Sequence, residues 1–104
     1  MMRLHMASAA VFLTITAAAV AQDLPAYDID KTCRKEAACF SKAKEASLSY
    51  DACRIQEAES RLRLQAMWPQ LSGPARRKCL EELGYSSSYW TLSECFDRGL
   101  WRFP

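Results

Sequence analysis

The sequence predicts an all-α fold, a small bundle of about four helices arranged as two disulfide-stapled αα-hairpins. Apolar residues recur at helical spacing in four successive segments. Five cysteines fall in a chain of only 104 residues, and their positions suit bonds across the turns between helices. The hydrophobic fraction of 50% is too high for a disordered chain, and the length allows one domain.

Residues 1–21 have the layout of a secretory signal peptide. A short, mildly basic start is followed by an apolar run from residue 6 to residue 21, which ends in Ala19-Val20-Ala21, an A-x-A cleavage pattern. The run is shorter than the roughly 20 residues that span a bilayer, although an uncleaved anchor is the alternative interpretation. We therefore expect residues 22–104 to form the helical domain. We also expect it to be exported to the periplasm or the cell exterior, without a transmembrane segment.

The single histidine, His5, lies inside this signal segment, so the domain after it has none. This excludes nucleophile systems that use a histidine base and metal or haem sites that use histidine ligands. Carboxylate pairs at neighbouring positions, such as Glu81 and Glu82, do not face one another on a helix. We predict no catalytic residue, no cofactor and no metal site. The net charge of +2 is too balanced for a dedicated nucleic-acid binder.

The first helix is predicted after Pro25, with Asp28 as its N-cap. Its inward face is a set of residues at helical spacing, namely Ile29, Cys33, Ala37 and Phe40. Cys39 follows Cys33 by six positions, about 240° around a helix. Cys33 is therefore expected to point to the core, and Cys39 is not.

The second helix is predicted from roughly Ser47 to Met67, and Pro69 ends it. It carries one apolar stripe of Leu48, Ala52, Ile55, Ala58, Leu62 and Ala66, and a second of Tyr50, Cys53, Leu64 and Trp68. A helix that is apolar on two sides is usually packed between other helices, which we expect here. The pairs Glu57–Arg61 and Glu59–Arg63 have favourable i,i+4 spacing.

Two shorter helices follow. Ser72 is the predicted N-cap of the third helix, Gly84 its stop, and Cys79, Leu80 and Leu83 its inward face. The run Ser86-Ser87-Ser88 offers N-caps for the fourth helix, and Gly99 ends or frays it. The apolar positions of that helix are Tyr89, Leu92, Cys95, Phe96 and Leu100.

The turns suggest how the cysteines pair, because residues equidistant from a hairpin turn lie opposite each other. Cys79 and Cys95 are centred on residue 87, and Cys33 and Cys53 are centred on residue 43, each inside a predicted turn. This pairing leaves Cys39 as a free thiol. A Cys39–Cys53 bond, centred on residue 46, is the alternative. Each such bond adds about 3 kcal/mol in the chain-entropy model, which a small core needs.

The pattern Cys53-x-x-x-Glu57-Ala58-x-x-x-Leu62, continued by Trp68, Arg76, Cys79, Gly84, Ser88-Tyr89, Leu92 and Cys95, resembles a family of small exported alpha-proteobacterial proteins. The resemblance covers residues 27–95 and implies export and a helical fold. It brings no catalytic residues. Cys39 is additional to the family pattern, and the first turn lacks the glycines that the family carries there.

Three features are candidates for binding. Arg76, Arg77 and Lys78 form a cationic cluster that could hold an anion or a partner, or could be a solvated face. Trp101 and Phe103 form an aromatic tail that could bind a partner or fold back on the helices. Cys39 could link two copies in a disulfide-bonded homodimer.

The leading hypothesis is a non-catalytic interaction or cell-envelope protein whose partner is another protein or an envelope component. The alternatives are a carrier of a small apolar ligand, and a thiol-dependent redox or regulatory protein that acts through Cys39. Close-packed alanines in the first two helices disfavour the carrier.

Overall fold

The computed structural model describes residues 23–84 and 87–103, and every regular element within these ranges is helical. The four α-helices are α1 (Ile29–Ala37), α2 (Ala43–Met67), α3 (Gly73–Arg77) and α4 (Tyr89–Asp97). Three short helices complete the fold: the 3-10 helices η2 (Trp68–Gln70) and η4 (Leu100–Arg102), and the π-helix η3 (Lys78–Glu82). The predicted all-α class is confirmed. The predicted signal segment, residues 1–21, lies outside the described residues.

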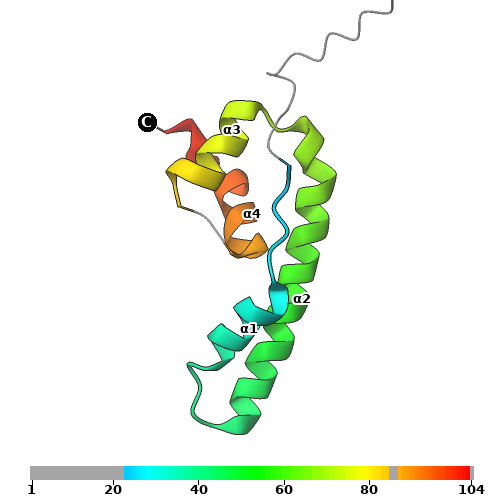
Figure 1. Cartoon of the computed structure of the whole chain (residues 1–104), viewed down its shortest axis with the longest axis vertical. Coiled ribbons are helices and arrows are strands. Elements are labelled where there is room, and N and C mark those ends of the chain that lie inside the picture. The colour runs from blue at the N-terminus through cyan, green and yellow to red at the C-terminus, as the bar shows by residue number, and fades with distance from the viewer. Residues whose placement is uncertain (1–22, 85–86, 104) are drawn as a thin grey trace, which may run out of the picture.

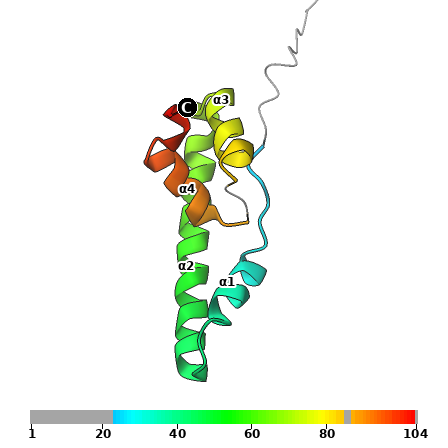
Figure 2. The same cartoon turned by 90° about the vertical axis from the view of Figure 1, so that its left-hand side faces the viewer.

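Helix α2 is the spine of the molecule (Figure 1). Helix α1 packs beside its first half, and α4 packs beside its second half. An extended segment, residues 23–28, leads into α1 along the same helix. Figure 1 shows this segment, α1 and α4 on the same side of α2, and in Figure 2 that side faces the viewer. Within the described ranges, no helix combines the length and apolar character needed to cross a membrane.

Two disulfides connect the helices as predicted. Cys33 of α1 bonds to Cys53 of α2, with Cα atoms 5.5 Å apart, and Cys79 of η3 bonds to Cys95 of α4, with Cα atoms 5.9 Å apart. Cys39 is unpaired and exposed in the turn between α1 and α2. The alternative Cys39–Cys53 bond is therefore wrong, and each hairpin has its own staple.

The helix ends follow from local hydrogen bonding. The side chains of Asp28, Ser72 and Ser88 accept hydrogen bonds from backbone N–H groups three residues later, at 3.0, 3.2 and 3.2 Å, which confirms all three predicted N-caps. Gly84 and Gly99 have φ values of +68° and +61°, the left-handed conformation that ends helices. Helix α2 begins at Ala43, four residues before the predicted start.

The third helix changes its winding after Arg77. The N–H of Leu83 donates to the carbonyl of Lys78, an i→i+5 bond of 2.9 Å, so η3 is wider than an α-helix. The wider turn keeps Cys79 buried but rotates the residues after it, and Leu83 is exposed rather than inward as predicted. It also brings the carboxylate of Glu82 to 3.9 Å from Nε of Arg77, five residues earlier.

The apolar core lies at the end of the molecule where α2, η3 and α4 meet. Its buried members are Leu64, Trp68, Ala75, Cys79, Tyr89, Leu92, Cys95 and Phe96. The rings of Trp68 and Phe96 meet edge to face at 5.7 Å. In α1 the buried residue is Cys33, so the opposite end depends on its disulfide far more than on apolar packing.

The prediction that α2 is packed on two sides is wrong. Its buried residues, Cys53, Glu57, Ser60 and Leu64, share one face, and both α1 and α4 attach there. The stripe that contains Leu48, Ile55 and Leu62 is exposed. A chain of this size has too few elements to cover a helix of 25 residues on both sides.

A buried carboxylate joins the two hairpins. Glu57 of α2 accepts hydrogen bonds from the Ser88 hydroxyl at 2.6 Å and from the backbone N–H groups of Tyr89 and Trp90 at 2.7 and 3.3 Å. These are the donors that the start of α4 would otherwise leave unpaired, and a negative charge there is favoured by the helix dipole. The predicted partner of Glu57, Arg61, instead lies over the ring of Tyr89 at 6.0 Å.

The predicted Glu59–Arg63 pair is also replaced by a contact between helices. Arg63 of α2 donates to both carboxylate oxygens of Asp97 in α4, at 2.8 and 2.7 Å. The i,i+4 spacing along α2 predicted that Arg63 would pair with Glu59. Instead α4 lies close enough for Asp97 to bind Arg63.

We predict that Glu57→Gln weakens the fold. The substitution replaces an oxygen that accepts hydrogen bonds by an amide group that cannot, and it removes the charge at the start of α4. The free energy of unfolding should fall by roughly 1.5–3 kcal/mol, the usual contribution of a hydrogen bond to a charged group. Urea unfolding followed by circular dichroism measures the change.

The matched control is Glu59→Gln, an exposed position on the same helix. It should change the free energy of unfolding by less than about 0.5 kcal/mol. Equal effects of the two substitutions would show that Glu57 does not hold α4.

Candidate functional site

One face of α2 exposes a continuous line of apolar residues, which we call the outer face. Its members are Leu48, Ala52, Ile55, Ala58, Leu62 and Ala66, and all are exposed. The three large side chains have exposed fractions of 60% for Leu48, 62% for Ile55 and 66% for Leu62. Contiguous exposed apolar surface of this kind marks binding sites more often than isolated apolar residues do.

Two open grooves run beside the outer face. The first, of about 850 Å³, is lined by residues that include Tyr50, Arg54 and Ile55, and the second, of about 380 Å³, by residues that include Arg61 and Leu62. Ile29 at the start of α1 and Ala58 of α2 line both, so the two hollows form neighbouring parts of one surface. This surface combines apolar side chains with charged ones, a composition that suits binding.

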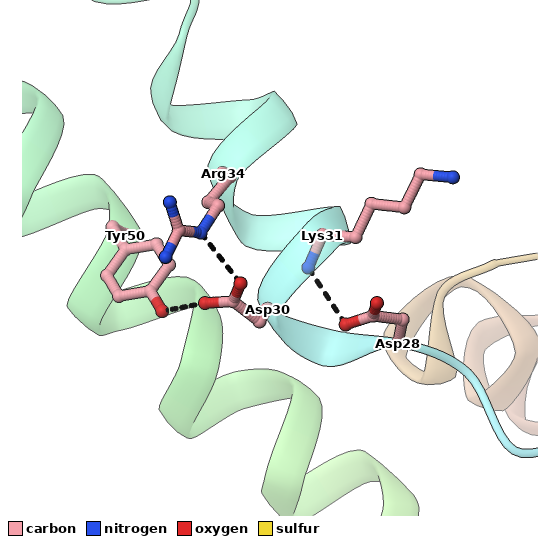
Figure 3. Close-up of polar contacts among 5 residues, drawn as sticks. All are labelled: Asp28, Asp30, Lys31, Arg34 and Tyr50. Atoms are coloured by element: carbon pink, nitrogen blue, oxygen red, sulfur yellow. Dashed lines mark hydrogen bonds and ion pairs between the residues drawn. The ribbon is translucent and has the colours of Figure 1, made fainter.

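A polar cluster closes the first groove at the α1 end (Figure 3). The hydroxyl of Tyr50 donates to one carboxylate oxygen of Asp30, and Nε of Arg34 donates to the other at 2.7 Å. The guanidinium of Arg54 lies 5.6 Å from the centre of the Tyr50 ring. Figure 3 also shows the Asp28 cap on the N–H of Lys31, which holds the first turn of α1 in place.

The electrostatics of this cluster oppose proton transfer. The hydrogen bond from Tyr50, followed by that from Arg34, lowers the pKa of Asp30, while the same bond to Asp30 is the main cause that raises the pKa of Tyr50. The two pKa values therefore move away from neutrality in opposite directions. A general acid or base works best with a pKa near the working pH, and both shifts carry these groups away from that range.

The predicted cationic cluster is not one surface. Arg76 is buried, with an exposed fraction of 8%, where its guanidinium donates to the carbonyl of Trp68 and lies 5.3 Å from that ring. Arg77 is exposed beside Glu82, and the amine of Lys78 donates to the carbonyl of Phe103. The structure thus gives each of the three cations a different contact.

The two aromatic residues of the predicted tail also have different surroundings. Trp101 is half-buried against the core, with the guanidinium of Arg102 5.0 Å from its ring. Phe103 has an exposed fraction of 62%, although its carbonyl is tied to Lys78. The tail therefore folds back on the helices as far as Trp101. The third candidate, Cys39, lies in the turn between α1 and α2.

Reasoning from sequence missed the outer face as a site, although it identified its residues. Both apolar stripes of α2 were assigned to the interior, because apolar periodicity does not tell which stripe is covered. Across residues 23–84 and 87–103 there is also no group of three or more potential metal ligands that could hold an ion. Comparison with known protein families, curated proteins and solved structures gives no match.

We predict that Tyr50→Phe raises the pKa of Asp30 toward its ordinary value, because the largest cause of its depression is the Tyr50 hydrogen bond. A depressed pKa contributes stability above the ordinary range of an aspartate, and this is lost as the pH falls through the folded value. The variant should therefore be less stable than the parent protein at neutral pH, and the difference should shrink as the pH falls through the range in which Asp30 titrates. Carbon-13 NMR titration of the Asp30 carboxyl measures the shift.

The control is Tyr27→Phe, which removes a hydroxyl that lies away from Asp30. Its Asp30 titration should match that of the parent protein. An unchanged Asp30 pKa in Tyr50→Phe would contradict the assigned cause.

Proposed function

We propose that this chain is a small exported protein, held by two disulfides, that binds a partner along the outer face of α2 and does not catalyse a reaction. The observation that carries the proposal is the exposed line of Leu48, Ile55 and Leu62 on a helix whose buried residues all lie on the opposite face. These residues are not part of the core, and they line up three of the most exposed large apolar side chains on one helix.

The disulfides support export. Bonds such as Cys33–Cys53 and Cys79–Cys95 form and persist in oxidising compartments and are rare in the cytosol. The layout of residues 1–21 as a signal peptide points the same way. The resemblance to small exported alpha-proteobacterial proteins agrees with both.

The chemistry of the grooves supports binding over catalysis. The Tyr50 hydroxyl donates a hydrogen bond to the Asp30 carboxylate, and the pKa values of both groups move away from neutrality. The sequence supplies no histidine after residue 5. The groove instead offers apolar area edged by charges, the usual composition of an interaction surface.

We predict that the full-length chain, expressed in a bacterial host, is recovered outside the cytoplasm as a product that starts at Gln22. Thiol blocking before mass measurement should modify Cys39 alone, because the other four cysteines are bonded. A version that lacks residues 1–21 is the control and should remain in the cytoplasm with reduced thiols. An intact mass that retains residues 1–21, or four blocked core cysteines in the exported product, would contradict export.

Binding is tested in the same cells with a photo-crosslinking amino acid. Placed at Ile55, it should form a covalent adduct, whereas at Glu36, an exposed position of α1, it should not. Adducts at neither position, or equally at both, would contradict a role for the outer face. Cys39→Ser should keep the adduct at Ile55, since the proposal gives the thiol no part in binding.

A further inference from the structure

We infer that the hollow between α1 and the turn before α4 is a second binding site, which takes a phosphate group. Three segments that are far apart in the sequence line this hollow, namely residues 26–28, one face of α1, and Ser87. Its volume is about 390 Å³, within the range of sites that hold small molecules. The outer face of α2 contributes none of the described residues of its lining, so the inference goes beyond the proposed function.

Two lysines supply the positive charge of this hollow. Lys31 and Lys35 lie one turn apart on α1, and both are exposed and line it. Like charges at this spacing are destabilising, so an anion held between the two amines relieves a repulsion as well as adding an attraction. Within the described ranges, the ion pairs are made by other cations and leave both amines to the solvent. Figure 3 shows the side chain of Lys31 extending away from the polar cluster at the first groove.

Among the described residues of the lining, the carboxylate is that of Asp28, and it is already engaged. It accepts the backbone N–H of Lys31 at 3.0 Å as the cap of α1. The described lining therefore carries two positive charges against one negative charge. Because the cap takes this N–H, the attraction for an anion comes from the two amines and not from the end of the helix.

Hydroxyl groups add further hydrogen-bonding capacity. Tyr27, Thr32 and Ser87 line the hollow beside the lysines. Burial is the main cause that raises the pKa of Tyr27, followed by the charge interaction with Tyr89, while a hydrogen bond with the backbone of Ser87 lowers it in part. The phenol of Tyr27 therefore keeps its proton and adds no negative charge. A phosphate group has several acceptor oxygens, which lysine amines and hydroxyls together are suited to bind.

Ser87 has a backbone conformation that favours glycine. Its φ is +71°, in the left-handed region, where a side chain is disfavoured. The carbonyl of Ser87 accepts the Thr32 hydroxyl at 2.7 Å, which holds the turn against α1 (Figure 2). A glycine would form the same turn at lower cost, so a serine here indicates a use for its hydroxyl, which we assign to the ligand.

The walls of the hollow are fixed by the fold itself. The N–H of Tyr27 donates to the hydroxyl of Tyr89 at 2.9 Å, and this hydroxyl donates to the carbonyl of Pro25 at 2.9 Å. Together with the contact between Thr32 and Ser87, these bonds join the extended segment, α1 and the start of α4. The site is therefore largely formed before a ligand binds, as small-molecule sites usually are.

The first test is an NMR titration of the purified, disulfide-bonded protein with inorganic phosphate, at neutral pH and constant ionic strength. The amide signals of Lys31, Lys35 and Ser87 should shift and reach saturation. Lys35→Gln removes one of the two amines and should raise the dissociation constant about tenfold, which corresponds to the loss of one charge-assisted hydrogen bond. Lys44→Gln makes the same change of charge at an exposed position outside the hollow and should leave the constant unchanged.

Ser87→Gly keeps the conformation of the turn and removes the hydroxyl, so it should also raise the dissociation constant. Shifts in the parent protein that do not saturate would overturn the inference. Equal losses of phosphate binding in Lys35→Gln and Lys44→Gln would overturn it too, because they would indicate attraction to the overall charge of the protein.

The second test distinguishes two sources of the phosphate group, a lipid headgroup and a phosphorylated small molecule. Sedimentation with vesicles of phosphatidylcholine and phosphatidylglycerol that is lost in Lys35→Gln, and kept in Lys44→Gln, assigns the headgroup. Saturable binding of inorganic phosphate without such sedimentation assigns the small molecule. Either result supports the site. Neither depends on the outer face, so the site and the proposed function can fail separately.

Discussion

The carboxylate of Glu57 decides which side of α2 the rest of the chain occupies. It receives the Ser88 hydroxyl and the first backbone N–H groups of α4, so α4 can begin only where Glu57 points. Glu57 shares its face with Cys53, one turn earlier, and the disulfide places α1 there too. Tyr89 extends the arrangement, because its hydroxyl accepts from the N–H of Tyr27 and donates to the carbonyl of Pro25, each at 2.9 Å. Exposure of the opposite face is a consequence of this one buried acceptor.

The two ends of the molecule are stabilised by different means. Where α4 packs, Leu64, Trp68, Leu92 and Phe96 supply apolar burial, and the Cys79–Cys95 bond lies within that core. Where α1 packs, Cys33 is the buried residue of the helix, and the disulfide is supplemented by exposed polar contacts such as Asp30 with Tyr50. Exposed contacts contribute little free energy. The α1 hairpin therefore depends on its covalent bond, which suits a protein that folds in an oxidising compartment.

The sequence predicts the features that depend on residues close in the chain and misses those that depend on contacts between distant segments. The caps at Asp28, Ser72 and Ser88 and the pairing of the cysteines about two turns follow from residues close in the chain, and all were predicted. The partner of Glu57 lies 31 residues away, and no periodicity reveals that a glutamate on an apparently charged face will be buried. The position of Arg76 over Trp68 depends likewise on the turn between α2 and α3. The outer face went unrecognised as a site because both stripes of α2 satisfy the same apolar pattern.

Folding and binding are separable in this design. Leu48, Ile55 and Leu62 are exposed and are not among the residues of the core or those packed against it, so polar residues in their place should leave the caps, the core and both disulfides intact. A fold alone gives no reason for three large apolar side chains in water, where their exposure costs solubility. Their spacing of seven residues keeps the three side chains on one side of the helix, as a surface that meets a partner requires. The constraint that places α1 and α4 on one side of α2 thereby leaves the other side open for the partner that we propose.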